Sequence, residues 1–161
     1  MPDGHLVPPG EDPHGPGVRV PPPVHVVLAL LLAWGLGRLV PVQLGPPAPG
    51  LGGAVFCLAL AWMGWALIVL VRAGNDPRPD RPDRAFVAAG PFRLSRNPIY
   101  LGFVLALAGV ALAWGTLWAW LAVGAVFLSL DLLVIRREET YLTRRFGDAY
   151  REYQRRTRRW M

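Results

Sequence analysis

The segment from Gly90 to Gly102 has residue types suited to binding an anion at the start of a membrane helix. It reads GPFRLSRNPIYLG. Gly90 and Pro91 predict a turn, and Asn97 followed by Pro98 predicts a helix start with asparagine as the N-cap. A helix N-terminus offers free backbone N–H groups and a positive dipole end, which favour a bound carboxylate or phosphate. Taken alone, the segment is more simply explained as a helix cap at a membrane border.

A second candidate contains two adjacent acids, Glu138 and Glu139, directly after an apolar run. It reads RREETYL from Arg136, and Phe146-Gly147, Tyr150 and Tyr153 follow. Paired carboxylates beside anionic lipid need cationic partners, which the neighbouring arginines or a sulfonium or ammonium ligand can supply. Taken alone, this segment also fits the solvated, charged start of a surface helix.

The elements that must position these residues are membrane helices. Hydrophobic residues make up 53% of the 161-residue chain and charged residues only 17%, a composition that favours a bilayer over water. Apolar runs predict transmembrane helices at about residues 24–40, 51–71, 99–113 and 117–135. The apolar stretch 99–135 would be about 55 Å long as one helix, against a hydrocarbon core of about 30 Å. It must therefore fold back, and Trp114-Gly115-Thr116 supplies the turn of a tight hairpin.

The predicted fold class is an all-α integral membrane protein with about four transmembrane helices and a cytoplasmic amphipathic C-terminal helix. Residues 1–23 are rich in proline and glycine and are predicted to form a disordered tail. Residues 24–161 form the membrane domain, with cytoplasmic segments at 84–102 and 136–160. After residue 135, apolar and aromatic residues recur at helical spacing among arginines, which is typical of a helix lying on a headgroup surface.

The distribution of arginine predicts the orientation in the membrane. The chain has no lysine, and its 17 arginines give a net charge of +6. They concentrate in residues 72–96 and after residue 135, whereas the loop 41–50 and the hairpin turn have none. By the positive-inside rule, both basic segments and both termini are expected to be cytoplasmic, in a multi-pass protein of the cell (inner) membrane.

The same composition indicates which partners to expect. A basic chain with long apolar runs points to anionic lipid headgroups and away from nucleic acid. The single cysteine, Cys57, excludes an internal disulfide and a cysteine metal site, and we expect it to be packed within the membrane. The three histidines lack ligand spacing, so no metal is expected.

Together, the two candidate segments resemble the isoprenylcysteine carboxyl methyltransferase family and its bacterial relatives. The shared pattern is G-P-[YF]-R-x-x-R-[HN]-P-x-Y-x-G, a helical hairpin, and then E-E-x-x-L-x-x-x-F-G-x-x-Y-x-x-Y. Arg158-Arg159-Trp160 resembles a truncated form of the family's closing R-x-P-R-W segment. The resemblance covers roughly residues 84–160, and both motifs occurring in order is far more specific than either alone.

The resemblance implies a cytoplasmic pocket for S-adenosyl-L-methionine, roofed by the C-terminal helix and open sideways to lipid. The positions that match the family's cofactor contacts are Arg84, Ala85, Phe86, Val87, Phe92, Asn97, Pro98, Ile99, Tyr100 and Glu138. Glu138 can accept from the ammonium or a ribose hydroxyl, and the aromatic rings can face the adenine or the sulfonium. Glu139, about 100° round the helix, is expected to face the basic loop near Arg93 and Arg96.

The implied reaction is methyl transfer to a membrane-soluble or lipid-like acceptor. Asn97 replaces the histidine of the eukaryotic enzymes and cannot titrate, and the arginine that holds their prenylcysteine carboxylate would fall near Val134. Arg136 or Arg137, half a turn on, becomes the candidate substrate-binding residue, and the prenylcysteine substrate is not carried over. The displacement needs little acid–base help, so the sequence identifies no catalytic residue.

Other interpretations stay open at this point. One is an NADPH-dependent membrane reductase of the sterol-reductase type, whose C-terminal half is similar to this family. Another is a non-catalytic membrane protein. Asp131, an acid inside an apolar run, is either functional or paired with Arg136. Gly102, Ala106 and Gly109 are expected to form a face for helix packing.

Overall fold

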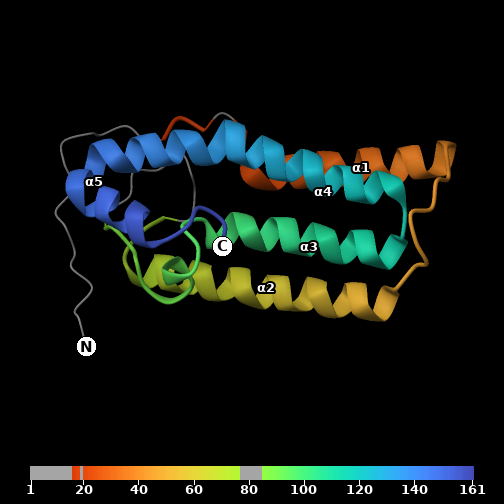
Figure 1. Cartoon of the computed structure of the whole chain (residues 1–161), viewed down its shortest axis with the longest axis horizontal. Coiled ribbons are helices and arrows are strands. Elements are labelled where there is room, and N and C mark those ends of the chain that lie inside the picture. Colours follow the sequence, from red (N-terminus) through yellow and green to blue (C-terminus); the bar gives the residue numbers. More distant parts are fainter. Residues whose placement is uncertain (1–15, 19, 77–84) are drawn as a thin grey trace.

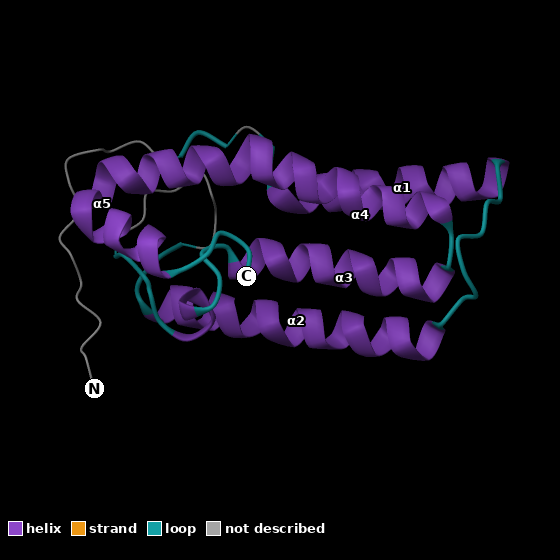
Figure 2. Cartoon of the chain, viewed as in Figure 1, coloured by secondary structure: helices purple, strands orange, loops and turns teal. Residues whose placement is uncertain are grey.

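The computed structural model describes residues 16–18, 20–76 and 85–161, and all named elements in these ranges are helices (Figure 2). The α-helices are α1 (Pro22–Leu39), α2 (Pro49–Arg72), α3 (Pro98–Trp114), α4 (Leu117–Ser129) and α5 (Arg136–Arg156), with a short 3-10 helix at Gly90–Arg93 and a π-helical segment at Leu130–Ile135. The expected disordered tail lies mostly outside the described residues, as does Arg84.

The predicted all-helical membrane protein is confirmed at the level of its elements. Three helical stretches are long and apolar enough to cross a membrane, namely α1, α2 and the stretch from Leu117 to Arg156, which comprises α4, the π-helical segment and α5. A shorter apolar helix of 17 residues, α3, pairs with them. Three of the helices begin with proline in the first turn, where the missing N–H costs nothing and the fixed φ suits a helix.

The helices form an antiparallel bundle with α3 at its centre. The most extensive helix contact joins α2 to α3, and α4 packs on both α1 and α3. The α1–α2 connection and the α3–α4 turn lie at one end of the bundle, and α5 lies at the other (Figure 1). All the segments that carry the sequence motifs therefore meet at the α5 end.

Small residues bring α2 and α3 together, as predicted for Gly102, Ala106 and Gly109. A Cβ atom built on Gly109 would lie 2.7 Å from the carbonyl oxygen of Gly52, and one on Gly52 would lie 2.4 Å from the carbonyl oxygen of Gly109. Backbone therefore packs on backbone at this crossing. Cys57 was expected to be packed, and this is wrong because α2 buries Gly52, Ala59 and Ala66 instead and leaves the thiol exposed.

The predicted hairpin turn is present at Gly115. This residue ends α3 with φ of 67°, a left-handed conformation that glycine adopts without strain. Thr116 then caps α4, because its Oγ1 accepts from the N–H of Ala119 at 3.3 Å. The α1–α2 loop is fastened to the same turn, since the Leu44 N–H donates to the carbonyl of Gly115 at 2.8 Å.

The chain after the last apolar run departs from the single uninterrupted helix that the aromatic spacing suggested. Gly147 has φ of 55° and ψ of −125°, and it bends α5 sharply. The later half of α5 consequently folds back over the end of the bundle toward the start of α3 (Figure 1). Glycine permits this bend because it lacks the Cβ that makes positive φ costly.

Candidate functional site

A cavity of about 120 Å³, open on one side, lies at the α5 end of the bundle. Its walls come from the end of α2, the segment 85–87, the start of α3 and both halves of α5. Every described residue that the resemblance marked for the cofactor lines it: Ala85, Phe86, Val87, Phe92, Asn97, Pro98, Ile99, Tyr100 and Glu138. The structure thus brings together residues that are more than 50 positions apart in the sequence.

The start of α3 supplies backbone donors to this cavity. Asn97 occupies the N-cap position and Pro98 the first helical position, as predicted, but the asparagine side chain makes no capping hydrogen bond. Its amide instead donates to the carbonyl of Arg159 at 3.0 Å. Because the first N–H groups of a helix have no partner within the helix, those of Ile99 and Tyr100 are suited to a ligand at the cavity.

The two adjacent acids have different surroundings. Glu138 lines the cavity, and its Oε1 accepts a short hydrogen bond from the hydroxyl of the buried Tyr100. Glu139 has only 10% of its side chain exposed, and its carboxylate pairs with Arg96 at 3.2 Å and with Arg159 at 2.6 Å. The expectation that Glu139 faces the basic loop is therefore met at Arg96, whereas Arg93 is exposed.

Arg159 connects this pair to Asp131 in the π-helical segment. Its Nη1 lies 3.2 Å from Oδ1 of Asp131, and hydrogen bonding to Glu139 raises the pKa of Arg159 above its ordinary value. The indole of Trp160 donates to the same Oδ1 at 3.2 Å, and Arg136 approaches Oδ2 at 3.5 Å. The ion pair between Asp131 and Arg136 is thus present, but it belongs to a larger cluster.

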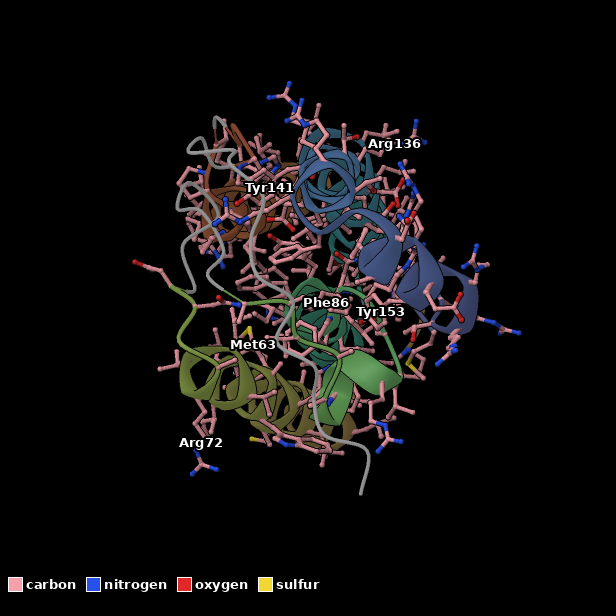
Figure 3. The ribbon with its side chains drawn as sticks, turned by 90° about the vertical axis from the view of Figure 1, so that its left-hand side faces the viewer. Met63, Arg72, Phe86, Arg136, Tyr141 and Tyr153 are labelled. Carbon is pink, nitrogen blue, oxygen red and sulfur yellow. The ribbon has the colours of Figure 1, made fainter. Side chains whose placement is uncertain are left out.

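Aromatic rings from two segments form one wall of the cavity. The ring centroid of Phe86 lies 5.1 Å from that of Tyr153 and 5.9 Å from that of Tyr150. Figure 3 shows Phe86 and Tyr153 side by side at this end of the molecule. Burial raises the pKa of both tyrosines above their usual range, so both hydroxyls stay protonated, and that of Tyr153 donates to the carbonyl of Phe92.

The segment that carries Phe86 is held by Asn75, a residue that no sequence pattern singled out. The side-chain amide of Asn75 donates to the carbonyl of Ala85 at 2.7 Å, and its Oδ1 accepts from the N–H of Ala85 at 2.9 Å. The two hydrogen bonds join the Asn75 side chain to the backbone of Ala85, as in a pair of β-strands. They hold this part of the cavity wall in place, while residues 77–84 lie outside the described chain.

The two candidate substrate-binding arginines do not line the cavity. Arg136 has 59% of its side chain exposed and pairs with Asp131, and Arg137 donates to the carbonyl of Gly17 at 3.1 Å. Residues that line the cavity without having been assigned include Asn75, Asp76, Arg96, Leu142, Tyr150 and Tyr153. Arg96 and both tyrosines were part of the recognised motifs, so a signal for them was present.

Comparison with known proteins identifies the family of this chain. A family model described as phospholipid methyltransferase matches residues 51–149, more than half of the chain. The chain therefore belongs to the phospholipid methyltransferase family, and its resemblance to the isoprenylcysteine carboxyl methyltransferases is confirmed at the level of the family.

Two curated relatives extend this finding. A methanethiol S-methyltransferase of Pseudomonas deceptionensis is 28% identical over 147 residues, which are 80% of this chain and 52% of that enzyme. The chain thus spans about half the length of that relative. An uncharacterized protein of Haemophilus influenzae is 47% identical over 68 residues, which are 39% of this chain and the whole of that protein. No solved structure gives a significant match.

Proposed function

We propose that the chain transfers a methyl group from S-adenosylmethionine to a membrane-soluble, lipid-like acceptor at the cytoplasmic face of the cell membrane. The observation that carries the proposal is the cavity itself. Nine residues that the family resemblance implies for cofactor binding line this single cavity, although they come from separate parts of the sequence. Membership of a methyltransferase family supports the same reaction class.

The groups that line the cavity fit this cofactor chemically. S-adenosylmethionine has an ammonium, a carboxylate, a ribose, an adenine and a sulfonium. Glu138 offers a carboxylate for the ammonium or a ribose hydroxyl, and the start of α3 offers N–H groups for the carboxylate. The cluster of Phe86, Tyr150 and Tyr153 offers ring faces for the adenine or the sulfonium.

The cofactor supplies an activated methyl group, because its sulfonium departs as a neutral thioether. The chain's own residues then have to bind, orient and exclude water. Tyr100 fixes the orientation of Glu138 by donating to its Oε1. Phe86 and the tyrosines of α5 cover one side of the cavity and keep water from the reacting atoms. We assign no residue of this chain as a general base.

Two classes of acceptor agree with the comparisons. The family description names phospholipids, and the relative from Pseudomonas is named for a small thiol. Both classes partition into or through a bilayer. In the topology that we propose, with four spans and both termini cytoplasmic, the cavity lies at the inner membrane surface and the basic residues of α5 face anionic headgroups.

The protein purified in detergent is expected to bind S-adenosylhomocysteine and not NADPH. Isothermal titration with each ligand tests this directly. The reason is that the cavity presents an acid and aromatic rings for the first ligand. Binding of NADPH without binding of S-adenosylhomocysteine would replace the methyltransferase proposal with the reductase alternative.

Replacing Glu138 with glutamine is expected to weaken S-adenosylhomocysteine binding by about 1.5–3 kcal/mol, the usual range for a hydrogen bond to a charged group. Glu138 lines the cavity, whereas Glu139 is turned into the ion-pair cluster. Glu139→Gln is the matched control, and it should lower the thermal stability more than the affinity. The assignment is wrong if Glu139→Gln loses the ligand while Glu138→Gln keeps it.

A further inference from the structure

Arg96 lines the cavity, yet neither the resemblance nor the comparisons assign it a role. Only 12% of its side chain is exposed. Its backbone N–H donates to the carbonyl of Arg158 at 2.9 Å, so the segment before α3 is held against the end of the chain. A guanidinium at this place gives the cavity a planar, permanently charged donor group.

The partners of Arg96 in the described part of the chain do not use all of its hydrogen-bonding groups. Its Nη2 lies 3.2 Å from Oε1 of Glu139, but Glu139 also accepts from Arg159 at 2.6 Å. One carboxylate is thus shared between two guanidinium groups. The Nε of Arg96 is buried and has no hydrogen-bond partner among the described residues. Because this atom is inaccessible, the 12% of the Arg96 side chain that is exposed comes from its other atoms, and a ligand in the cavity can reach only those.

Arg96 belongs to a cluster of charged side chains at the α5 end of the bundle. The cluster contains three arginines, Arg96, Arg136 and Arg159, and two acids, Asp131 and Glu139. Of the three arginines, only Arg96 is among the described residues that line the cavity. Arg96 is therefore the cation of this cluster that a ligand in the cavity can reach.

The cavity also contains the opposite charge. Among the described residues, Glu138 and Asp76 are the acids that line it. Arg96, Glu138 and Tyr150 all line this one cavity. A cation and an anion that line the same cavity match a ligand with a carboxylate and an ammonium on one carbon.

We propose that Arg96 and Glu138 form a zwitterion clamp, in which Arg96 binds the α-carboxylate of the cofactor's methionine group while Glu138 binds its α-ammonium. The proposal rests on the proposed function and adds a specificity-determining residue to it. The N–H groups of Ile99 and Tyr100 complete the carboxylate site, because both residues lie in the first turn of α3 and line the cavity. Glu139 and Arg159 keep the guanidinium of Arg96 in place.

The test compares S-adenosylhomocysteine with its decarboxylated analogue, which keeps the amine and the adenosine but lacks the carboxylate. Both ligands are titrated calorimetrically into the full-length wild-type protein, Arg96→Gln and Arg93→Gln. The wild type is expected to prefer S-adenosylhomocysteine by about 10- to 100-fold, as a charge-assisted hydrogen bond allows. Arg96→Gln should reduce this preference to about onefold to threefold. Arg93 is exposed in the same segment, and Arg93→Gln should keep the full preference.

The outcomes separate this inference from the proposed function. If the wild type binds S-adenosylhomocysteine but does not prefer it to the analogue, the clamp is wrong while the proposed function stands. A preference that survives in Arg96→Gln has the same meaning, because the carboxylate is then held by other groups. Failure of the wild type to bind S-adenosylhomocysteine at all overturns the proposed function first. Should Arg96→Gln not fold, Arg96→Lys keeps the charge without the planar guanidinium and should show a reduced preference.

Discussion

Replacing Gly109 with alanine is expected to lower the free energy of unfolding by about 3 kcal/mol, near the upper end for overpacked positions. The added Cβ would lie 2.7 Å from the carbonyl oxygen of Gly52 and 2.8 Å from the backbone nitrogen of Phe56. Both neighbours are backbone atoms of α2, so no side chain can rotate away. Helices α2 and α3 would have to separate along their contact.

Gly124→Ala is the matched control, because it makes the same change inside α4 where nothing lies within 4 Å of the added Cβ. Its effect should stay below about 1 kcal/mol, the difference in helix propensity between glycine and alanine. Thermal unfolding of both variants in the same detergent, followed by circular dichroism, measures the contrast. Equal stability of the two variants would mean that α2 and α3 are not in backbone contact.

Replacing Arg159 with alanine is expected to lower the free energy of unfolding by about 2–3 kcal/mol, somewhat less than the cost of breaking a fully buried ion pair. The guanidinium contacts Glu139 at 2.6 Å and Asp131 at 3.2 Å, and the exposed fractions of these two acids are 10% and 15%. Arg159 itself is 32% exposed, so solvent screens part of the interaction. Without it, two poorly solvated carboxylates lose their shared cation.

Arg158→Ala is the control for this experiment. The Arg158 side chain is exposed, and among the described residues its one contact named here is made by its backbone carbonyl, which accepts from the N–H of Arg96. Chemical denaturation in detergent should therefore distinguish two neighbouring arginines. The double variant Asp131→Asn/Arg159→Ala should be less destabilised than the sum of its single changes, because the two residues interact directly. Additive effects, or equal losses for Arg158→Ala and Arg159→Ala, would contradict the role of the cluster.

The sequence predicted the bundle closely because hydropathy and proline act locally. The apolar run at 51–71 corresponds to Pro49–Arg72, and the break proposed at Trp114-Gly115-Thr116 is where α3 ends and α4 begins. The site was predicted in part, since the expected residues of segments 85–100 and Glu138 meet at one cavity. Whether these residues bind the cofactor is still a prediction.

Other features depend on contacts between distant parts of the chain and could not be read from local patterns. The aromatic spacing of α5 suggested one helix, because the sequence does not show that Gly147 adopts a positive φ. The amide of Asn97 was assigned to capping, but it donates to Arg159, which lies 62 positions away. Arg136 follows the apolar run directly and was therefore a candidate site residue. Its side chain pairs with Asp131 and does not line the cavity.

The bend at Gly147 divides the cavity-lining residues of α5 between two parts of the helix. Glu138 and Leu142 precede it on a helix continuous with the bundle, whereas Tyr150 and Tyr153 follow it on the part that folds back. Release of that second part would expose the cavity without separating any of the helices α1 to α4. Opening of the cavity is therefore a local unfolding event, with a free energy below that of the whole protein. A ligand bound beneath these tyrosines would raise that free energy and so slow their hydrogen exchange first.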